Sequence, residues 1–141
     1  MTSTSVRTLD PQLDAVATRL VEFLRTGAAP DGLFAADMFC DLTIPTWRLQ
    51  ADDAAGAIGL RSMGHPWPGE VTTRRLDPIP GGFLIEVEER WLDGGDAWYC
   101  RELIRADVRD GAIVELSVYC TGDWDSARVA EHAAAVTLIR P

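Results

Sequence analysis

The chain has 141 residues, of which 47% are hydrophobic, 25% charged and 8% aromatic. This is the composition of one globular domain, and two full domains would not fit comfortably in this length. With 13 basic and 22 acidic residues, the formal net charge of −9 argues against nucleic acid and anionic membranes as partners.

Several further classes of protein are disfavoured by simple patterns. No run approaches the roughly 18 apolar residues of a membrane-spanning helix, and residues 1–7 carry no apolar stretch of a signal peptide. The cysteines are odd in number, far apart and in no zinc-like spacing: Cys40, Cys100 and Cys120. We therefore expect a cytoplasmic protein with no cofactor and no metal, built as a single domain over residues 1–141 with a flexible N-terminus over residues 1–9.

The first predicted element is a helix that begins at Asp10-Pro11 and ends at Gly27. Aspartate is a favourable N-cap, and proline is favoured at the first helical position. Apolar residues then recur at spacings of three and four, at Leu13, Val16, Leu20 and Leu24. This spacing is typical of a helix with one buried face.

An irregular region follows the first helix. A turn at Pro30-Asp31-Gly32 leads into a short apolar segment, Leu33 to Ala36, which we interpret as a short helix. Met38 to Leu49 then reads as an extended stretch, with an edge position or a bend at Pro45.

A second full helix is predicted after this extended stretch. Asp52 or Asp53 can serve as its N-cap, and the helix continues through about Ser62. The segment His65-Pro-Trp-Pro-Gly69 must be a loop, because proline and glycine interrupt both helices and strands.

The second half of the chain is predicted to form a sheet. Its four strands are Val71 to Asp77, Phe83 to Leu92, Ala97 to Arg109 and Ala112 to Cys120. Asp93-Gly-Gly-Asp96 and Asp110-Gly111 are strong short-hairpin signals, so the last three strands form an antiparallel meander. With a C-terminal helix over Ser126 to Val136, the chain has an α+β plan in which helices cover one face of a curved sheet.

The two hairpin turns predict which side chains share a face of the sheet, because each turn sets the register of its strands. A first turn at Gly94-Gly95 places Val87 opposite Glu102, and a second at Asp110-Gly111 places Glu102 opposite Tyr119. The resulting face is mostly apolar with a few polar groups: Phe83, Ile85, Val87, Glu89, Trp91, Trp98, Cys100, Glu102, Ile104, Ala106, Val108, Ile113, Ser117 and Tyr119.

The opposite face is charged on two strands but apolar on the last one. Val114, Leu116 and Val118 would form an unprotected apolar strip in water. We therefore expect this face to dock on a second copy of the chain and form a homodimer.

The element order and several segments resemble the nuclear transport factor 2-like superfamily. These segments are Leu33-Phe34 through Asp41-Leu-Thr-Ile-Pro45, Arg109-Asp-Gly-Ala-Ile-Val-Glu115 and the closing Tyr119-Cys-Thr-Gly-Asp-Trp-Asp125. The last looks like a subgroup of SnoaL-like proteins. The resemblance implies a cone-shaped fold with a pocket between the helices and the concave sheet face, a dimer contact on the other face, and relatives that include ketosteroid isomerases, polyketide cyclases and scytalone dehydratase.

The chain departs from the catalytic patterns of these relatives. Ketosteroid isomerases place an aspartate base before a proline on the first strand, where this chain has Ile44 before Pro45. The tyrosine of their first helix is absent here. Of the pocket histidines of scytalone dehydratase, only His65 lies near the expected mouth, and Asp123 is the nearest counterpart of the SnoaL-like aspartate. No mechanism of the family carries over intact.

The predicted pocket face nevertheless carries groups for acid–base chemistry. Glu102 in an apolar cavity would have a raised pKa and could act as a general acid or base, with Tyr119 and Glu89 as partners. The alternative is that Glu102 and Tyr119 form a satisfied buried polar pair. Asp123 and His65 are secondary catalytic candidates; Asp123 could equally cap a turn, and His65 could be an exposed loop residue.

The residues expected to line the ligand pocket are Trp47, Trp67, Trp91, Trp98, Cys100 and Ser117. An aromatic-lined cavity suits a hydrophobic, ring-containing ligand, although tryptophans are also common core residues. The first functional hypothesis is a SnoaL-like enzyme of secondary metabolism that performs cofactor-independent cyclisation, isomerisation or dehydration. A non-catalytic binding or accessory protein and a purely structural dimer are the alternatives.

Overall fold

The computed structural model describes residues 9–141, and this part of the chain contains three helices and one six-stranded sheet. The elements in chain order are α1 (Pro11–Thr26), β1 (Phe34–Ile44), β2 (Trp47–Ala51), α2 (Ala54–Gly64), β3 (Gly69–Ile79), β4 (Gly82–Asp93), β5 (Asp96–Arg109), β6 (Ala112–Cys120) and α3 (Ser126–Ala135). Residues 1–8 of the segment expected to be flexible lie outside the described residues, and Leu9 packs against the core.

Helix α1 has the ends that its sequence predicts. The Asp10 carboxylate accepts a hydrogen bond from the Gln12 backbone N–H at 2.7 Å, which satisfies one free donor of the first turn. At the other end Gly27 adopts the left-handed conformation, with φ of 78°, and its N–H donates to the Phe23 carbonyl. The face between these caps is buried in the core.

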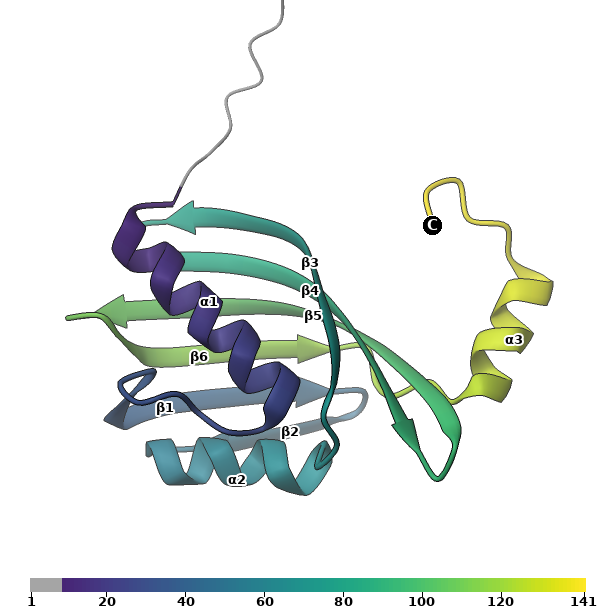
Figure 1. The fold of residues 1–141 in the computed structure, drawn as a ribbon, viewed down its shortest axis with the longest axis horizontal. Coiled ribbons are helices and arrows are strands. Elements are labelled where there is room, and N and C mark those ends of the chain that lie inside the picture. The colour runs from purple at the N-terminus through teal and green to yellow at the C-terminus, as the bar shows by residue number, and fades with distance from the viewer. Residues whose placement is uncertain (1–8) are drawn as a thin grey trace, which may run out of the picture.

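The sheet contains more strands than the predicted meander. Its strand order is β2-β1-β6-β5-β4-β3, in which β1 runs parallel to β6 and all other pairs are antiparallel (Figure 1). The short helix predicted at Leu33 to Ala36 is wrong, because Phe34 already pairs with Ile113 of β6. The predicted bend at Pro45 is confirmed as the turn between β1 and β2.

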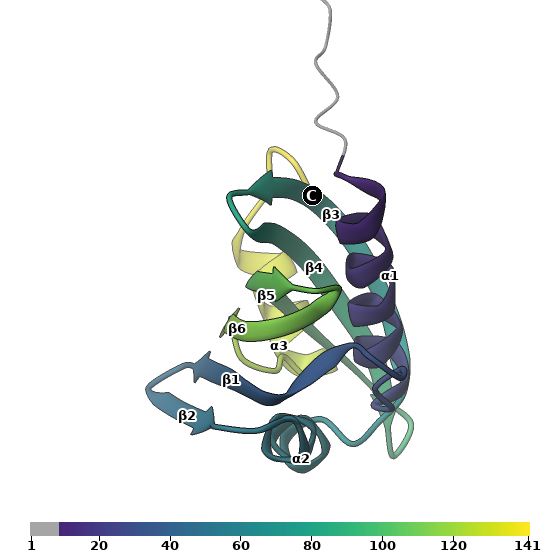
Figure 2. The ribbon, with the colours of Figure 1, turned by 90° about the vertical axis from the view of Figure 1, so that its left-hand side faces the viewer.

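The first two helices lie on the same side of the curved sheet (Figures 1 and 2). Helix α1 packs across β3 and β4, and α2 packs against β1 and β2. Helix α3 lies beyond the ends of the strands, and the segment just before it is joined to β5 by paired backbone hydrogen bonds between Tyr99 and Trp124. The core therefore forms between α1, α2 and the concave face of the sheet.

The register of the β4–β5 hairpin is confirmed. Trp91 faces Trp98, Glu89 faces Cys100 and Val87 faces Glu102. Glu89 and Glu102 are 1% and 5% exposed, as expected for side chains on the inner face.

The register of the β5–β6 hairpin is correct only beside its turn. Val108 pairs with Ile113 as predicted, but Asp107 then pairs with Glu115, so β6 contains one extra residue at Val114. Because side chains alternate with a period of two, one extra residue exchanges the two faces of the strand beyond it. Glu102 consequently lies opposite Cys120 rather than Tyr119.

This bulge corrects the residues assigned to both faces of β6. Leu116 and Val118 are buried in the core, so the exposed apolar strip expected at Val114, Leu116 and Val118 is wrong. Tyr119 points outward and is 57% exposed. Ser117 also points away from the pocket, and its hydroxyl accepts a hydrogen bond from Arg105 at 3.0 Å.

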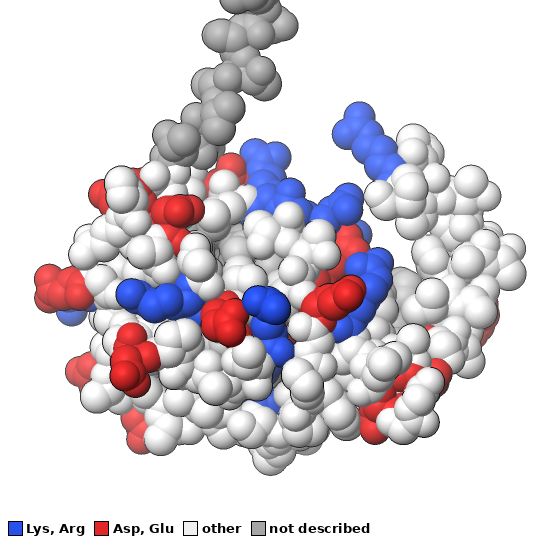
Figure 3. Space-filling model, in the orientation of Figure 1, with Lys and Arg blue, Asp and Glu red and all other residues white. Residues whose placement is uncertain are grey.

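The charged residues of the surface occur in both signs side by side (Figure 3). On the outer face of the sheet they form cross-strand ion pairs, such as Arg101 with Glu86 at 3.0 Å and Arg105 with Glu115 at 2.7 Å. Among the described residues, each helix is too short or too polar to cross a membrane.

Candidate functional site

A cavity of about 250 Å³ lies between the two inner helices and the concave face of the sheet. Most of its wall is apolar and comes from α1, β1, β2, α2, β5 and β6: Phe23, Leu24, Phe34, Leu42, Ile44, Pro45, Leu49, Ala57, Leu60, Met63, Ile104, Leu116 and Val118. Four ionisable side chains besides thiols reach it: Arg61, His65, Glu102 and Asp123. An apolar chamber with few polar groups is the usual form of a small-molecule site.

Glu102 is the carboxyl group set into this apolar wall. It lies on β5 between Cys100 and Ile104, which also face the cavity because strand residues two apart share a face. Burial raises the pKa of Glu102 well above its ordinary value, and a hydrogen bond to Glu89 and the charge of Glu89 raise it further. Glu102 therefore holds its proton to a higher pH than an ordinary glutamate does.

Glu89 is the anionic partner of this carboxyl. The Arg61 guanidinium donates to both of its oxygens, at 2.5 and 3.0 Å. Burial alone would raise the pKa of Glu89, but the hydrogen bonds from Glu102 and Arg61 outweigh it and lower that pKa. Two carboxyl groups thus share one cation, and one of them carries a proton.

Arg61 connects helix α2 to this pair and was missed by the sequence analysis. Its Nη1 lies 3.7 Å from a Glu102 oxygen, and its Nη2 also donates to the Leu24 carbonyl at 2.6 Å. The sequence contained one signal for its position: Arg61 follows Ala57 by four residues, and residues four apart lie on the same face of a helix. Ala57 is on the face of α2 that packs inward. An arginine on that face requires a buried anion, which the strands supply.

His65 is buried and lines the cavity, so the alternative of an exposed loop histidine is wrong. It terminates α2, where its backbone N–H donates to the Arg61 carbonyl at 2.7 Å. Its ring packs on Trp91, with centroids 4.1 Å apart. Burial lowers the pKa of His65, and the nearby Arg61 charge lowers it further, so the imidazole is neutral.

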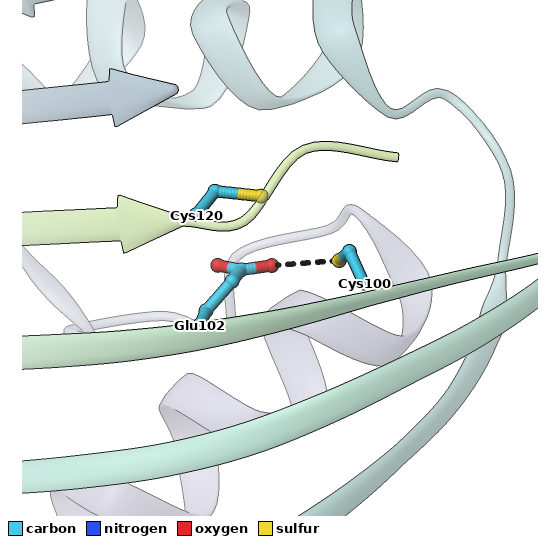
Figure 4. A group of neighbouring side chains, drawn as sticks. All are labelled: Cys100, Glu102 and Cys120. Atoms are coloured by element: carbon cyan, nitrogen blue, oxygen red, sulfur yellow. Dashed lines mark hydrogen bonds between the residues drawn. The ribbon is translucent and has the colours of Figure 1, made fainter. Parts of the chain in front are cut away.

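Two thiols lie beside Glu102 (Figure 4): Cys100, two residues away on β5, and Cys120, which the register shift in β6 brings opposite Glu102. The ligand atoms of Cys100, Glu102 and Cys120 lie within 4.8 Å of one another, and the Cys100 thiol donates to a Glu102 oxygen at 3.6 Å. By distance alone these atoms could surround a metal ion. The Arg61 cation beside Glu102 opposes a second cation there, so the chemistry of this cluster is better described as that of thiols beside a carboxyl group.

The three thiols share one cavity but differ in acidity. A hydrogen bond with Cys100 lowers the pKa of Cys120, against the opposing effect of burial, and the Gly122 N–H also donates to the Cys120 sulfur at 3.4 Å. The pKa of Cys100 is raised by the same hydrogen bond and by burial, and burial raises the pKa of Cys40 to about 11.

We expect iodoacetamide at neutral pH to alkylate Cys120 first, about tenfold or more faster than the other two cysteines, because the thiolate is the nucleophile. Peptide mass spectrometry over a time course measures the order. In the matched variant Cys120→Ser, Cys40 should react slowly at its original rate, because Cys120 does not contribute to the raised pKa of Cys40. Modification of Cys40 or Cys100 before Cys120 would contradict the assigned acidities.

The other predicted site residues divide into two groups. Asp123 follows β6 and lines the cavity at a partly solvated position, where burial and the charge of Glu89 raise its pKa. Tyr119 and Ser117 point away from the cavity because of the bulge in β6.

The tryptophan wall expected for the pocket is also corrected. In the described part of the chain, Trp47, Trp67, Trp91 and Trp98 do not line the cavity. Trp91 and Trp98 stack at the β4–β5 hairpin end, Trp67 packs edge-on to His65, and Trp47 is 62% exposed on the edge strand. The cavity wall is thus mainly aliphatic.

Comparisons of the chain with known proteins identify its fold. No protein-family model and no curated protein matches the chain. Among solved structures, a nuclear transport factor 2-like protein from Anabaena variabilis superposes with a TM-score of 0.67 at 17% identity, covering 87% of this chain and 96% of that one. A protein of ketosteroid isomerase-like fold from Catenulispora acidiphila, solved in complex with trimethylamine, gives 0.63 at 15% identity over 87% and 97%. A Mycobacterium tuberculosis LEH-like epoxide hydrolase gives 0.61 at 15% identity over 77% and 82%.

These similarities agree with the architecture of the chain. The curved mixed sheet, with α1 and α2 over its concave face, is the cone-shaped fold of the nuclear transport factor 2-like superfamily. The fold expected from the sequence resemblance is therefore confirmed. At this level of identity the similarity concerns the fold, and function has to be argued from the site.

Proposed function

We propose that the chain is an enzyme that performs acid–base chemistry, such as cyclisation, isomerisation or dehydration, on a hydrophobic ring-containing small molecule bound in the cavity. The observation that carries this proposal is Glu102, a buried carboxyl group with a raised pKa in the wall of an apolar chamber. A neutral carboxylic acid in such a place can donate a hydrogen bond or a proton to a substrate oxygen.

Glu102 acts as the general acid in this proposal. In the acid step the Glu102 proton turns from Glu89 to a substrate carbonyl or hydroxyl oxygen, and negative charge that develops on that oxygen is stabilised by the hydrogen bond. The Arg61–Glu89 pair positions Glu102 and keeps it protonated, since a second buried anion beside Glu89 would be costly. Arg61 and Glu89 are positioning residues.

Asp123 is the candidate base. It lines the same cavity at its partly solvated side, and its raised pKa makes the carboxylate a better proton acceptor than an ordinary aspartate. In an isomerisation, Asp123 would take a proton from the carbon next to a carbonyl held by Glu102 and return it to the γ-carbon. The double bond moves, and no proton is lost or gained overall.

The structural neighbours support chemistry of this class. One is named an epoxide hydrolase and another has a ketosteroid isomerase-like fold. Both names connect this fold to reactions of small molecules, and the apolar wall of the present cavity suits a hydrophobic substrate.

The proposal is tested with a β,γ-unsaturated cyclohexenone as the probe substrate. We expect the protein to convert it to the conjugated isomer, which is followed by its absorbance. Glu102→Gln should lower the turnover by about 100-fold or more, because the amide cannot supply an acidic proton. The matched control Glu86→Gln changes an outer-face carboxylate, 37% exposed, and should retain the parent rate.

The results of this test distinguish an enzyme that uses Glu102 from a protein that only binds the ligand. Unchanged turnover in a folded Glu102→Gln protein would remove Glu102 from the mechanism. Binding of the cyclohexenone without any conversion by the parent protein would favour the alternative, a non-catalytic ligand-binding protein. One observation favours that alternative: Glu102 already has hydrogen-bond partners within the protein, in Glu89 and Cys100.

A further inference from the structure

His65 is a buried polar side chain without a hydrogen-bond partner among the residues that the structure describes. It is 8% exposed, and among the described residues neither ring nitrogen makes a hydrogen bond. The ring packs against Trp91 at an interplanar angle of 68°. A neutral imidazole carries one donor and one acceptor, and leaving both unpaired away from water costs free energy. Its side chain lines the cavity, so a bound molecule can supply the missing partner.

The polar groups of the cavity lie at one end. Arg61 lies in the last turn of α2 and His65 is its C-cap, while Glu102 lies in the middle of β5, opposite Cys120 at the end of β6. Arg61 on α2 contacts Glu89 on β4 and Glu102 on β5. The wall contributed by α1 and by the other lining residues of β1 is mainly apolar. A complementary ligand is hydrophobic with its oxygen at one end.

The charge of this polar end indicates an uncharged ligand. The Arg61 guanidinium is already neutralised by the Glu89 carboxylate at 2.5 Å. Glu102 and His65 are neutral, and Asp123 adds negative charge at the partly solvated side. An anionic ligand would therefore find no free positive charge among the described lining residues, and burying it would be costly.

We propose that the cavity binds an uncharged hydrophobic molecule whose hydroxyl or carbonyl oxygen forms a hydrogen bond with the His65 imidazole. This inference rests on the proposed function in that it takes the cavity as the ligand site, and it adds the class of ligand and the residue that selects it. Because the imidazole has both a donor and an acceptor, it pairs with either oxygen group.

The inference is tested with β-naphthol and β-methylnaphthalene, which differ by a hydroxyl in place of a methyl group. Equilibrium dialysis measures both dissociation constants at pH 7. We expect the parent protein to bind β-naphthol about tenfold more tightly, because the methyl compound leaves His65 unpaired. In His65→Phe the preference should disappear, whereas His65→Asn, which keeps a donor and an acceptor, should retain part of it. His132→Phe on α3, the only other histidine of the chain, should bind like the parent.

A second measurement keeps the test decisive if His65→Phe does not fold. The ring nitrogen signals of His65 and His132 are followed by NMR in the parent protein during titration with β-naphthol. A shift of the His65 nitrogens with an unchanged His132 supports the inference, and unchanged His65 nitrogens at saturation overturn it.

The remaining outcomes distinguish this inference from the proposed function. If β-naphthol binds and its preference over β-methylnaphthalene persists in His65→Phe, the role of His65 is wrong and the proposed function stands. If β-naphthoate binds more tightly than β-naphthol, the ligand class is wrong. If neither neutral compound binds the parent protein, the cavity is not a site for such molecules, and the inference and the proposed function fall together.

Discussion

Replacing Arg61 with methionine is expected to lower the free energy of unfolding by about 3–5 kcal/mol. The substitution keeps much of the side-chain volume but leaves the Glu89 carboxylate, only 1% exposed, without its cation. An isolated buried charge is among the costliest features a folded protein can contain. Urea unfolding at pH 7, followed by tryptophan fluorescence, measures the change.

Two further variants separate the buried ion pair from a general effect of removing arginine. The double variant Arg61→Met with Glu89→Leu removes both charges and should recover part of the lost stability. Arg101→Met removes the outer-face pair with Glu86, whose side chains are 50% and 37% exposed, and should change stability by less than about 1 kcal/mol. A loss in Arg61→Met no larger than that in Arg101→Met would refute the role of the buried pair.

The second large effect concerns the pH dependence of stability. Glu102 holds its proton in the folded protein well above the ordinary carboxyl pKa of 4.5, at which it ionises in the unfolded chain. Above that pH the unfolded chain binds fewer protons than the folded protein, so the stability contribution of Glu102 falls as the pH rises. Between its ordinary pKa of 4.5 and its raised pKa in the folded protein, the slope from this group approaches about 1.4 kcal/mol per pH unit.

The Glu102→Gln variant isolates this contribution, because glutamine does not titrate. The free energy of unfolding is measured in urea at several pH values, and the difference between variant and parent should grow in favour of the variant as the pH rises. Taking this difference removes the contribution of His65, whose lowered pKa acts in the opposite direction below its ordinary value of 6.5. Glu86→Gln should follow the parent curve, and a pH-independent difference for Glu102→Gln would contradict a buried, protonated carboxyl.

Local interactions explain why much of the fold was predictable. The Asp10 cap, the left-handed Gly27 and the apolar spacing between them define α1 within a single stretch of chain. The glycine-containing turns likewise set the β4–β5 register, so Glu89 and Glu102 were placed correctly on the inner face. These features depend on residues that are close in sequence.

The incorrect face assignments on the last strand come from one irregularity in β6. The turn at Asp110-Gly111 was recognised, but the extra residue at Val114 reverses every side chain after it. Tyr119 and Ser117 therefore left the predicted site, while Cys120 entered it. The turn sequence contains no signal for such a bulge, because the parallel pairing of β6 with distant β1 also helps to define the register of this strand.

By itself, the sequence determined the helices, the hairpins and the presence of two carboxyl groups on an apolar face, since these follow from capping, turn geometry and alternation. The tertiary structure decided the chemistry of those carboxyl groups. Arg61 lies 28 residues before Glu89, and its place between Glu89 and Glu102 depends on how α2 packs against the sheet. The same packing buries His65 with unpaired nitrogens. Protonation depends on burial and on neighbouring charge, and both are properties of the packed molecule rather than of any short segment.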